Sequence, residues 1–246
     1  MKNRLSAIKL LGVTITDETE DTILKYILQR LKTTRDKFFI VTPNPEIIVY
    51  ANKRSDYKTN LISAAVSLPD GTGVFLGSLV LGHWLHQRIP GVDFIDFICQ
   101  KTKDQPISMG FLGGRHGVAE KTVKCLKKKY PWINVAFVGE EWPKEAYSTK
   151  SAGIDMLFVA FGFPRQEEWI YENLDRLPVR CAMGVGGAFD YISGHVQRAP
   201  FLVRVLGFEW LYRLIKQPWR WRRQAALIEF VRLLLKERLK KKKIID

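Results

Sequence analysis

The apolar run from Ile154 to Phe161 is the feature that most limits what this chain can fold into. Asp155 is its one polar residue. Because a β-strand points successive side chains to opposite faces, a run this continuous needs apolar cover on both faces. Strands of that kind belong to parallel sheets with helices on either side. The run therefore predicts an α/β fold.

Segments of strand and helix type alternate along the chain, which supports the same fold class. Alternation of this kind is typical of a Rossmann-like parallel sheet with helices on both faces. The other predicted strands are Ile8 to Ile15, Phe38 to Val41, Ala64 to Leu68, Ile107 to Leu112, Val135 to Val138 and Val179 to Val185. The predicted helices are an amphipathic one through Ile23 and Leu31, then Pro45 to Lys53, Gly73 to Gly82, Phe94 to Lys101, Val118 to Lys129 and Trp169 to Asn173.

Polar and turn-forming residues follow most of these strands at the carboxyl end. Thr42-Pro43-Asn44 follows one strand, and Pro69-Asp70-Gly71 follows another. Open α/β sheets bind their ligands at this edge, so these side chains are candidates for a site. Each also has a purely structural interpretation, since Asn44 can cap the helix that begins at Pro45 and Asp70 can form an Asx-turn.

Glycine-rich turns mark two further strand ends. Gly113-Gly114 lies between a strand and the helix that starts at Val118, and Gly186-Gly187 precedes Asp190. Glycines let the backbone approach a phosphate or a base, and the amino terminus of a helix favours negative charge. These turns indicate a nucleotide-type unit, although the strict dinucleotide pattern is absent.

Positive charge is concentrated near the carboxyl end. The net charge is +14, and residues 201–246 contribute +9 of it. This segment is also aromatic and amphipathic, with Trp219 and Trp221 before the predicted helix Ala225 to Leu239. We expect a catalytic domain over residues 1–195 and a basic helical appendage over residues 196–246. The appendage either contacts an anionic membrane surface or packs on the sheet with a solvated basic face.

Several classes of protein lose support from the sequence. Three cysteines far apart favour a reducing compartment, and no segment has the features of a signal peptide or a spanning helix. No spacing of His, Cys or paired Asp predicts a metal site. The motifs of serine hydrolases and of P-loop NTPases are missing.

What remains is one well-placed carboxylate, Asp70, together with several arginines. Transfer from a nucleotide diphosphate requires a base for the acceptor's proton and positive charge for the departing diphosphate. Arginine can supply that charge without a metal ion. The residues that fit these roles are Asp70, Arg88, Arg213, Arg220 and Arg223.

Several strings together resemble the WecG/TagA/CpsF glycosyltransferases over nearly the whole chain. They are TPNPEI (42–47), LPDGTG (68–73), RIPGVD (88–93), FGFPRQEEWI (161–170), GVGGAFDYISG (184–194) and the segment from Arg198 to Arg223. The resemblance implies an inverting, metal-independent transferase without a cofactor. Members of this family move a sugar, commonly N-acetylmannosamine or its uronic acid, from a UDP-sugar to a polyprenyl-diphosphate-linked saccharide at the cytoplasmic face of the membrane.

The resemblance also implies roles for individual residues. Asp70 would be the general base that deprotonates the acceptor hydroxyl. Thr42, Asn44 and Gln166 would position donor and acceptor, and Arg88 matches an arginine of the family's site. Arg213, Arg220 and Arg223 would close over the diphosphate, while Gly113, Gly114, Gly186, Gly187 and Asp190 would hold the nucleotide.

The chain departs from the family's pattern after the fourth strand. Relatives often have a His-Gly-Tyr-Phe type segment where this chain reads Val138-Gly139-Glu140-Glu141-Trp142-Pro143. UDP-glucuronic acid and UDP-glucose therefore stay open as donors. A non-catalytic protein that binds nucleotide or nucleic acid is the competing interpretation, but nucleic acid is not the expected partner. The segment Gly73 to Leu85 is either core or a homo-oligomer interface.

Overall fold

A computed structural model describes residues 5–143, 153–216, 218 and 221–245 of the 246-residue chain. Its centre is a six-stranded sheet in the order β4-β3-β8-β7-β5-β6, and every neighbouring pair in it is parallel. This confirms the predicted α/β class with a parallel sheet. The strands are β3 (Phe38–Val41), β4 (Val66–Ser67), β5 (Ser108–Gly113), β6 (Asn134–Gly139), β7 (Ile154–Ala160) and β8 (Val179–Gly184).

The central strand β7 is buried on both faces, as its continuous apolar run predicts. Met156 and Phe158 face one apolar core, while Leu157 and Val159 face the other. The first core also takes side chains from α1 (Glu20–Thr33), α5 (Gly91–Lys101), α6 (Val118–Lys129) and α8 (Ala188–Ile192). The second takes them from α2 (Pro45–Lys53), α3 (Ser55–Ile62), α4 (Thr72–Val80) and α7 (Arg165–Asn173).

The amino-terminal segment corrects one prediction. Ile8 to Ile15 is not one strand, because β1 (Ala7–Leu10) and β2 (Val13–Thr16) pair antiparallel with each other. Leu11 and Gly12 both have positive φ, at 52° and 77°. Two such residues in succession form the tight turn that suits a hairpin, and they end the first strand after Leu10. The predicted start of α7 at Trp169 is also wrong, since the helix begins at Arg165.

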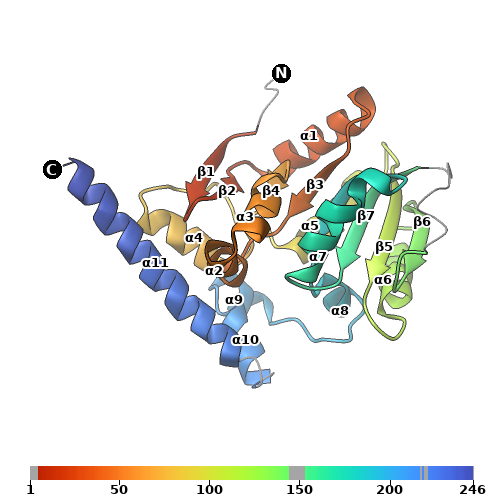
Figure 1. Cartoon of the computed structure of the whole chain (residues 1–246). Coiled ribbons are helices and arrows are strands. Elements are labelled where there is room, and N and C mark those ends of the chain that lie inside the picture. The colour runs from red at the N-terminus through yellow and green to blue at the C-terminus, as the bar shows by residue number, and fades with distance from the viewer. Residues whose placement is uncertain (1–4, 144–152, 217, 219–220, 246) are drawn as a thin grey trace.

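The carboxyl-terminal part of the chain forms three helices, α9 (Phe201–Val205), α10 (Glu209–Lys216) and α11 (Trp221–Ile245). Helix α11 runs past α2 and α4 along one side of the molecule, while α9 and α10 lie below α2 in the view of Figure 1. Phe230 and Leu234 of α11 are buried in the second core. One face of the appendage thus packs on helices α2 and α4 of the α/β domain, not on the sheet itself.

Candidate active site

A cavity of about 1560 Å³ lies where the parallel strands end. It collects the predicted site residues from segments far apart in the sequence, because parallel strands place all their carboxyl ends at one edge. Arg220 lies outside the described residues, and the side chain of Arg223 lies outside the described part of α11. The predicted residues that line the cavity are Thr42, Asn44, Asp70, Arg88, Gly113, Gly114, Gln166, Gly186, Gly187, Asp190 and Arg213.

Asp70 lines this cavity from the turn that follows β4. Its backbone N–H donates to the carbonyl of Pro43 at 3.3 Å, which ties the turn after β4 to the turn after β3. Burial raises the pKa of Asp70 to about 7, although part of the side chain is open to the cavity. A carboxyl group with that pKa can accept a proton near neutral pH more readily than an ordinary aspartate.

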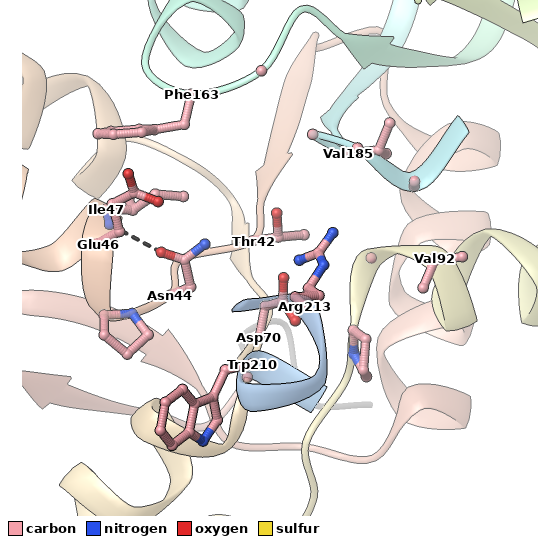
Figure 2. A pocket seen from close by; sticks show the side chains of 18 of the residues that line it. Thr42, Asn44, Glu46, Ile47, Asp70, Val92, Phe163, Val185, Trp210 and Arg213 are labelled. Atoms are coloured by element: carbon pink, nitrogen blue, oxygen red, sulfur yellow. Dashed lines mark hydrogen bonds between the residues drawn. The ribbon is translucent and has the colours of Figure 1, made fainter. Parts of the chain in front are cut away.

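Two arginines act on the Asp70 carboxylate. Arg213 and Arg88 both lower its pKa, against the larger effect of burial, and Figure 2 shows Arg213 beside Asp70. The Arg213 guanidinium stacks over the ring of Tyr191, 4.6 Å from its centroid. Tyr191 thus holds Arg213, a role that the sequence analysis did not predict. The two guanidinium groups thus place positive charge around the Asp70 carboxylate.

Arg88 also joins the α/β domain to the appendage. One of its nitrogens donates to the Thr72 hydroxyl at 2.9 Å, and the other donates to the backbone carbonyl of Arg204 at 3.0 Å. Thr72 is the first residue of α4, while Arg204 lies in α9. The orientation of Arg88 therefore depends on the position of α9.

Thr42 and Asn44 follow β3 and are fixed by bonds to the backbone. The buried Thr42 hydroxyl donates to the carbonyl of Gly184 at 3.2 Å. Asn44 is the N-cap of α2, since its Oδ1 accepts from the Ile47 N–H at 3.0 Å. Because that bond needs an acceptor, it leaves the Asn44 amide nitrogen pointing away from Ile47 (Figure 2). Capping and ligand contact are thus compatible at Asn44.

Gln166 is held by its neighbours on both sides of its amide group. Its Oε1 accepts from the Gly186 N–H at 2.8 Å, and its Nε2 donates to Glu167 at 2.7 Å. Glu167 is fully buried, and that burial raises its pKa to about 7. This pair fixes the glycine turn after β8. The sequence analysis missed Glu167, because an acidic residue in the first turn of a helix is common for reasons of helix polarity alone.

The glycine turn after β5 is tight for steric reasons. Gly113 has a φ of +99°, and a Cβ there would lie 2.9 Å from the backbone of Ala160. Glu140 accepts a bond from the Gly117 N–H at 2.9 Å, so a protein carboxylate occupies one donor at the start of α6. The segment that departs from the family's pattern reaches the cavity here, since Glu140, Glu141 and Trp142 line it.

Arg198 makes two ion pairs next to the site, one with the α/β domain and one within the appendage. Arg198 donates to both carboxylate oxygens of Asp93, with an Nη2 to Oδ2 distance of 2.7 Å. Its Nε lies 3.9 Å from Glu209 at the start of α10. Glu209 in turn raises the pKa of Asp70. The position of α10 is thus coupled to the charge of the site.

The described residues contain neither a cluster of metal ligands nor a membrane-spanning helix. No group of three or more His, Cys, Asp or Glu side chains is placed to hold a metal ion in the part of the chain that the structure describes. None of the helices within the described ranges combines the length and the apolar character needed to cross a membrane.

The parallel sheet thus carries a carboxyl group of raised pKa and two arginines at the edge where α/β sheets bind ligands. The family model described as "Glycosyl transferase WecG/TagA/CpsF family" matches residues 8–244. The chain belongs to this family and is a glycosyltransferase.

Three of the similar proteins carry the same name. A protein of Bacillus spizizenii named "N-acetylglucosaminyldiphosphoundecaprenol N-acetyl-beta-D-mannosaminyltransferase" is 36% identical over 202 residues, which is 80% of this chain and 79% of the relative. A Bacillus subtilis protein of the same name is 35% identical over 82% of this chain and 81% of its own length. A Staphylococcus aureus protein, also of that name, is 30% identical over 92% of this chain and 90% of its own.

Proposed function

We propose that this chain transfers N-acetylmannosamine from its UDP-sugar to N-acetylglucosamine on a polyprenyl diphosphate, as a step in the synthesis of a cell-surface polysaccharide or teichoic acid. The names of the relatives supply the two sugars and the lipid. The observation that carries the chemistry is the Asp70 carboxylate, with its pKa of about 7, beside Arg213. A base and a cation at one point are what such a transfer needs.

The reaction we propose is a single displacement. Asp70 takes the proton of the acceptor hydroxyl as the hydroxyl oxygen attacks the anomeric carbon. The bond from that carbon to the diphosphate breaks, and UDP leaves with the electron pair. Because the oxygen attacks opposite the leaving group, the configuration at the anomeric carbon inverts. Positive charge from Arg88 and Arg213 stabilises the departing diphosphate, so no metal ion is required.

The other site residues position the substrates in this proposal. Thr42 and the Asn44 amide nitrogen contact the sugars near Asp70. Gln166 acts through the Gly186 N–H, to which it is bound, and shapes the turn that faces the nucleotide. Arg220 and Arg223 stay predictions as further contacts of the diphosphate. Gly113, Gly114, Gly187 and Asp190 complete the nucleotide side of the cavity.

We further propose that the appendage, residues 196–246, holds the enzyme on an anionic membrane at the inner face of the plasma membrane. Apolar side chains are exposed on α9, on α10, on the turn between them and at the start of α11, close in sequence to basic residues. Surface attachment usually needs both signals, apolar insertion and positive charge. The exposed apolar side chains are Phe201, Leu202, Val205, Leu206, Phe208, Trp210, Leu211, Ile215 and Trp221.

UDP release tests the proposed reaction. The parent protein is assayed with UDP-N-acetylmannosamine, UDP-glucuronic acid and UDP-glucose, with EDTA present and with a prenyl-diphosphate N-acetylglucosamine as acceptor. We expect acceptor-dependent release with the first donor, and a decrease in kcat of at least about 100-fold in Asp70→Asn, which is typical of a lost general base. Asp96→Asn is the matched control, since Asp96 pairs with Lys129 outside the cavity.

Other outcomes would contradict the proposal in specific ways. UDP release only with UDP-glucuronic acid or only with UDP-glucose would show that the donor is not UDP-N-acetylmannosamine. Full activity in Asp70→Asn would show that Asp70 is not the general base. Loss of activity with EDTA that added Mg²⁺ restores would refute the metal-independent reaction.

A further inference from the structure

The cavity has an apolar arm that the transfer reaction itself does not use. Helices α4 and α11 form this arm. The residues after Gly73 that these helices contribute to the cavity lining are all apolar. This differs from the polar end of the same cavity, where Asp70 and Arg213 lie. The arm is lined by Leu76, Gly77 and Val80 from α4, and by Leu227, Phe230, Val231, Leu234 and Leu235 from α11.

A close helix crossing shapes the arm. A Cβ on Gly77 would lie 2.9 Å from Phe230 Cζ and 3.1 Å from Leu234 Cδ1, so the two helices touch at this glycine. Beside the crossing, the side chains of Leu76, Val231 and Leu235 are 54%, 48% and 52% exposed. Large apolar side chains that line a cavity while still half exposed leave an apolar surface open to a ligand.

Helix α4 sets the order of polar and apolar groups along the cavity. Thr72, at its first position, holds Arg88. Leu76 follows one turn later and Val80 one turn beyond that, at about 6 Å and 12 Å along the axis from Thr72. Positive charge therefore lies at one end of α4, and apolar side chains lie at increasing distance from it.

We propose that this arm binds the first isoprene units of the acceptor's polyprenyl chain. The inference rests on the proposed function, in which the acceptor is a prenyl diphosphate that carries a sugar. Such a molecule has a sugar hydroxyl, then a diphosphate, then an apolar chain. The cavity has Asp70 at one end and the apolar arm at the other, so an acceptor whose hydroxyl lies at Asp70 can extend its chain into the arm.

General contact with the membrane would not require this arm. Ile228 and Leu239 of α11 are also apolar and are 75% and 63% exposed, but they do not line the cavity. Continuity of the arm with Asp70 is what selects the acceptor's own chain as its occupant. The helix therefore offers a matched pair, in which Leu235 lines the arm and Leu239, one turn further along, does not.

The experiment compares Leu235→Ser and Leu239→Ser with the parent. The KM is measured for two acceptors in detergent micelles, one with a long prenyl chain and one with a single isoprene unit. We expect Leu235→Ser to raise the KM for the long-chain acceptor about tenfold, which corresponds to about 1.4 kcal/mol, less than full burial of a leucine. Its kinetics with the short acceptor, and both KM values of Leu239→Ser, should match the parent.

Two further measurements keep the test independent of folding and of the transfer reaction. Leu76→Ser probes the arm from α4 and should reproduce the effect of Leu235→Ser. Fluorescence titration with a sugar-free long-chain prenyl diphosphate measures binding even if no donor is used. An inactive parent would refute the proposed function, whereas this titration would still show whether Leu235→Ser weakens binding. Equal KM values in Leu235→Ser and Leu239→Ser, or equal binding by both, would overturn the inference.

Discussion

Replacing Asp70 by Asn should make the folded protein more stable at alkaline pH while it removes the base. Burial raises the pKa of Asp70 from 3.8 to about 7. Between these two values the folded chain binds more protons than the unfolded chain, so stability falls as the pH rises from 3.8 to 7. Asn has no charge and does not contribute to this loss.

The size of the effect follows from the two pKa values. One pH unit between them corresponds to about 1.4 kcal/mol. Relative to strongly acidic pH, the Asp70 carboxylate therefore costs at most about 2 kcal/mol at pH 5 and about 4 kcal/mol at pH 8. These are upper limits, because the side chain is partly open to the cavity and solvent screens part of the charge.

Urea unfolding of the parent and of Asp70→Asn at pH 5, 6, 7 and 8 measures how much stability the Asp70 carboxylate costs at each pH. The variant's gain in free energy of unfolding should increase up to pH 7 and then level off. Comparison at each pH in the same buffer cancels the other titrating groups. A gain that is constant across the range, or that decreases with pH, would refute the argument that Asp70 is held at a cost for its function.

Three other predictions concern groups around Asp70 and the appendage. Arg213 lowers the pKa of Asp70 and Glu209 raises it, so in pH profiles of kcat/KM the acidic limb should move up in Arg213→Gln and down in Glu209→Gln. Glu167→Ala removes the acceptor of the Gln166 amide and should raise the KM for donor several-fold in initial-rate measurements, while Glu167→Gln, which keeps an acceptor oxygen, should retain most of the affinity. Phe230→Ala should cost about 3 to 5 kcal/mol of packing between α11 and α4, so trypsin should cleave α11 faster.

Each of these has an outcome that would count against it. Shifts of the acidic limb in the same direction in both charge variants would show that Asp70 does not govern it. Equal KM values in Glu167→Ala and Glu167→Gln would remove Glu167 as a positioning residue. Unchanged proteolysis of Phe230→Ala, with Ile228→Ala as the exposed control, would show that this contact does not hold α11.

The sheet was predictable because the continuous apolar run of β7 indicates a strand buried on both faces. Because helices alternate with the strands along the chain, the strands were expected to be parallel. The helices Pro45–Lys53 and Val118–Lys129 were predicted to the residue, since Pro45 and the glycines before Val118 mark where they begin. The hairpin before them was not predicted, because Ile8 to Ile15 has the composition of one strand and the turn depends on the positive φ values of Leu11 and Gly12, which appear only in the structure.

The site was predictable to the extent that its residues follow strands. Asp70, Thr42 and Asn44 each stand at a strand's end and line the cavity. Partners that reach the site from elsewhere were missed, such as Tyr191 beneath Arg213 and Glu167 beside Gln166. No sequence motif indicates these two contacts, because each of them forms only in the folded structure.

The contact of Gly77 with Phe230 sets a limit on how the sequences of this family can diverge. A larger residue at position 77 and a large ring at position 230 cannot share the same space, so the sizes of the two side chains are not free to change separately. Relatives with alanine or serine at the first position should have a smaller residue at the second. The two positions are 153 residues apart in the chain, yet substitutions at them should be correlated among relatives.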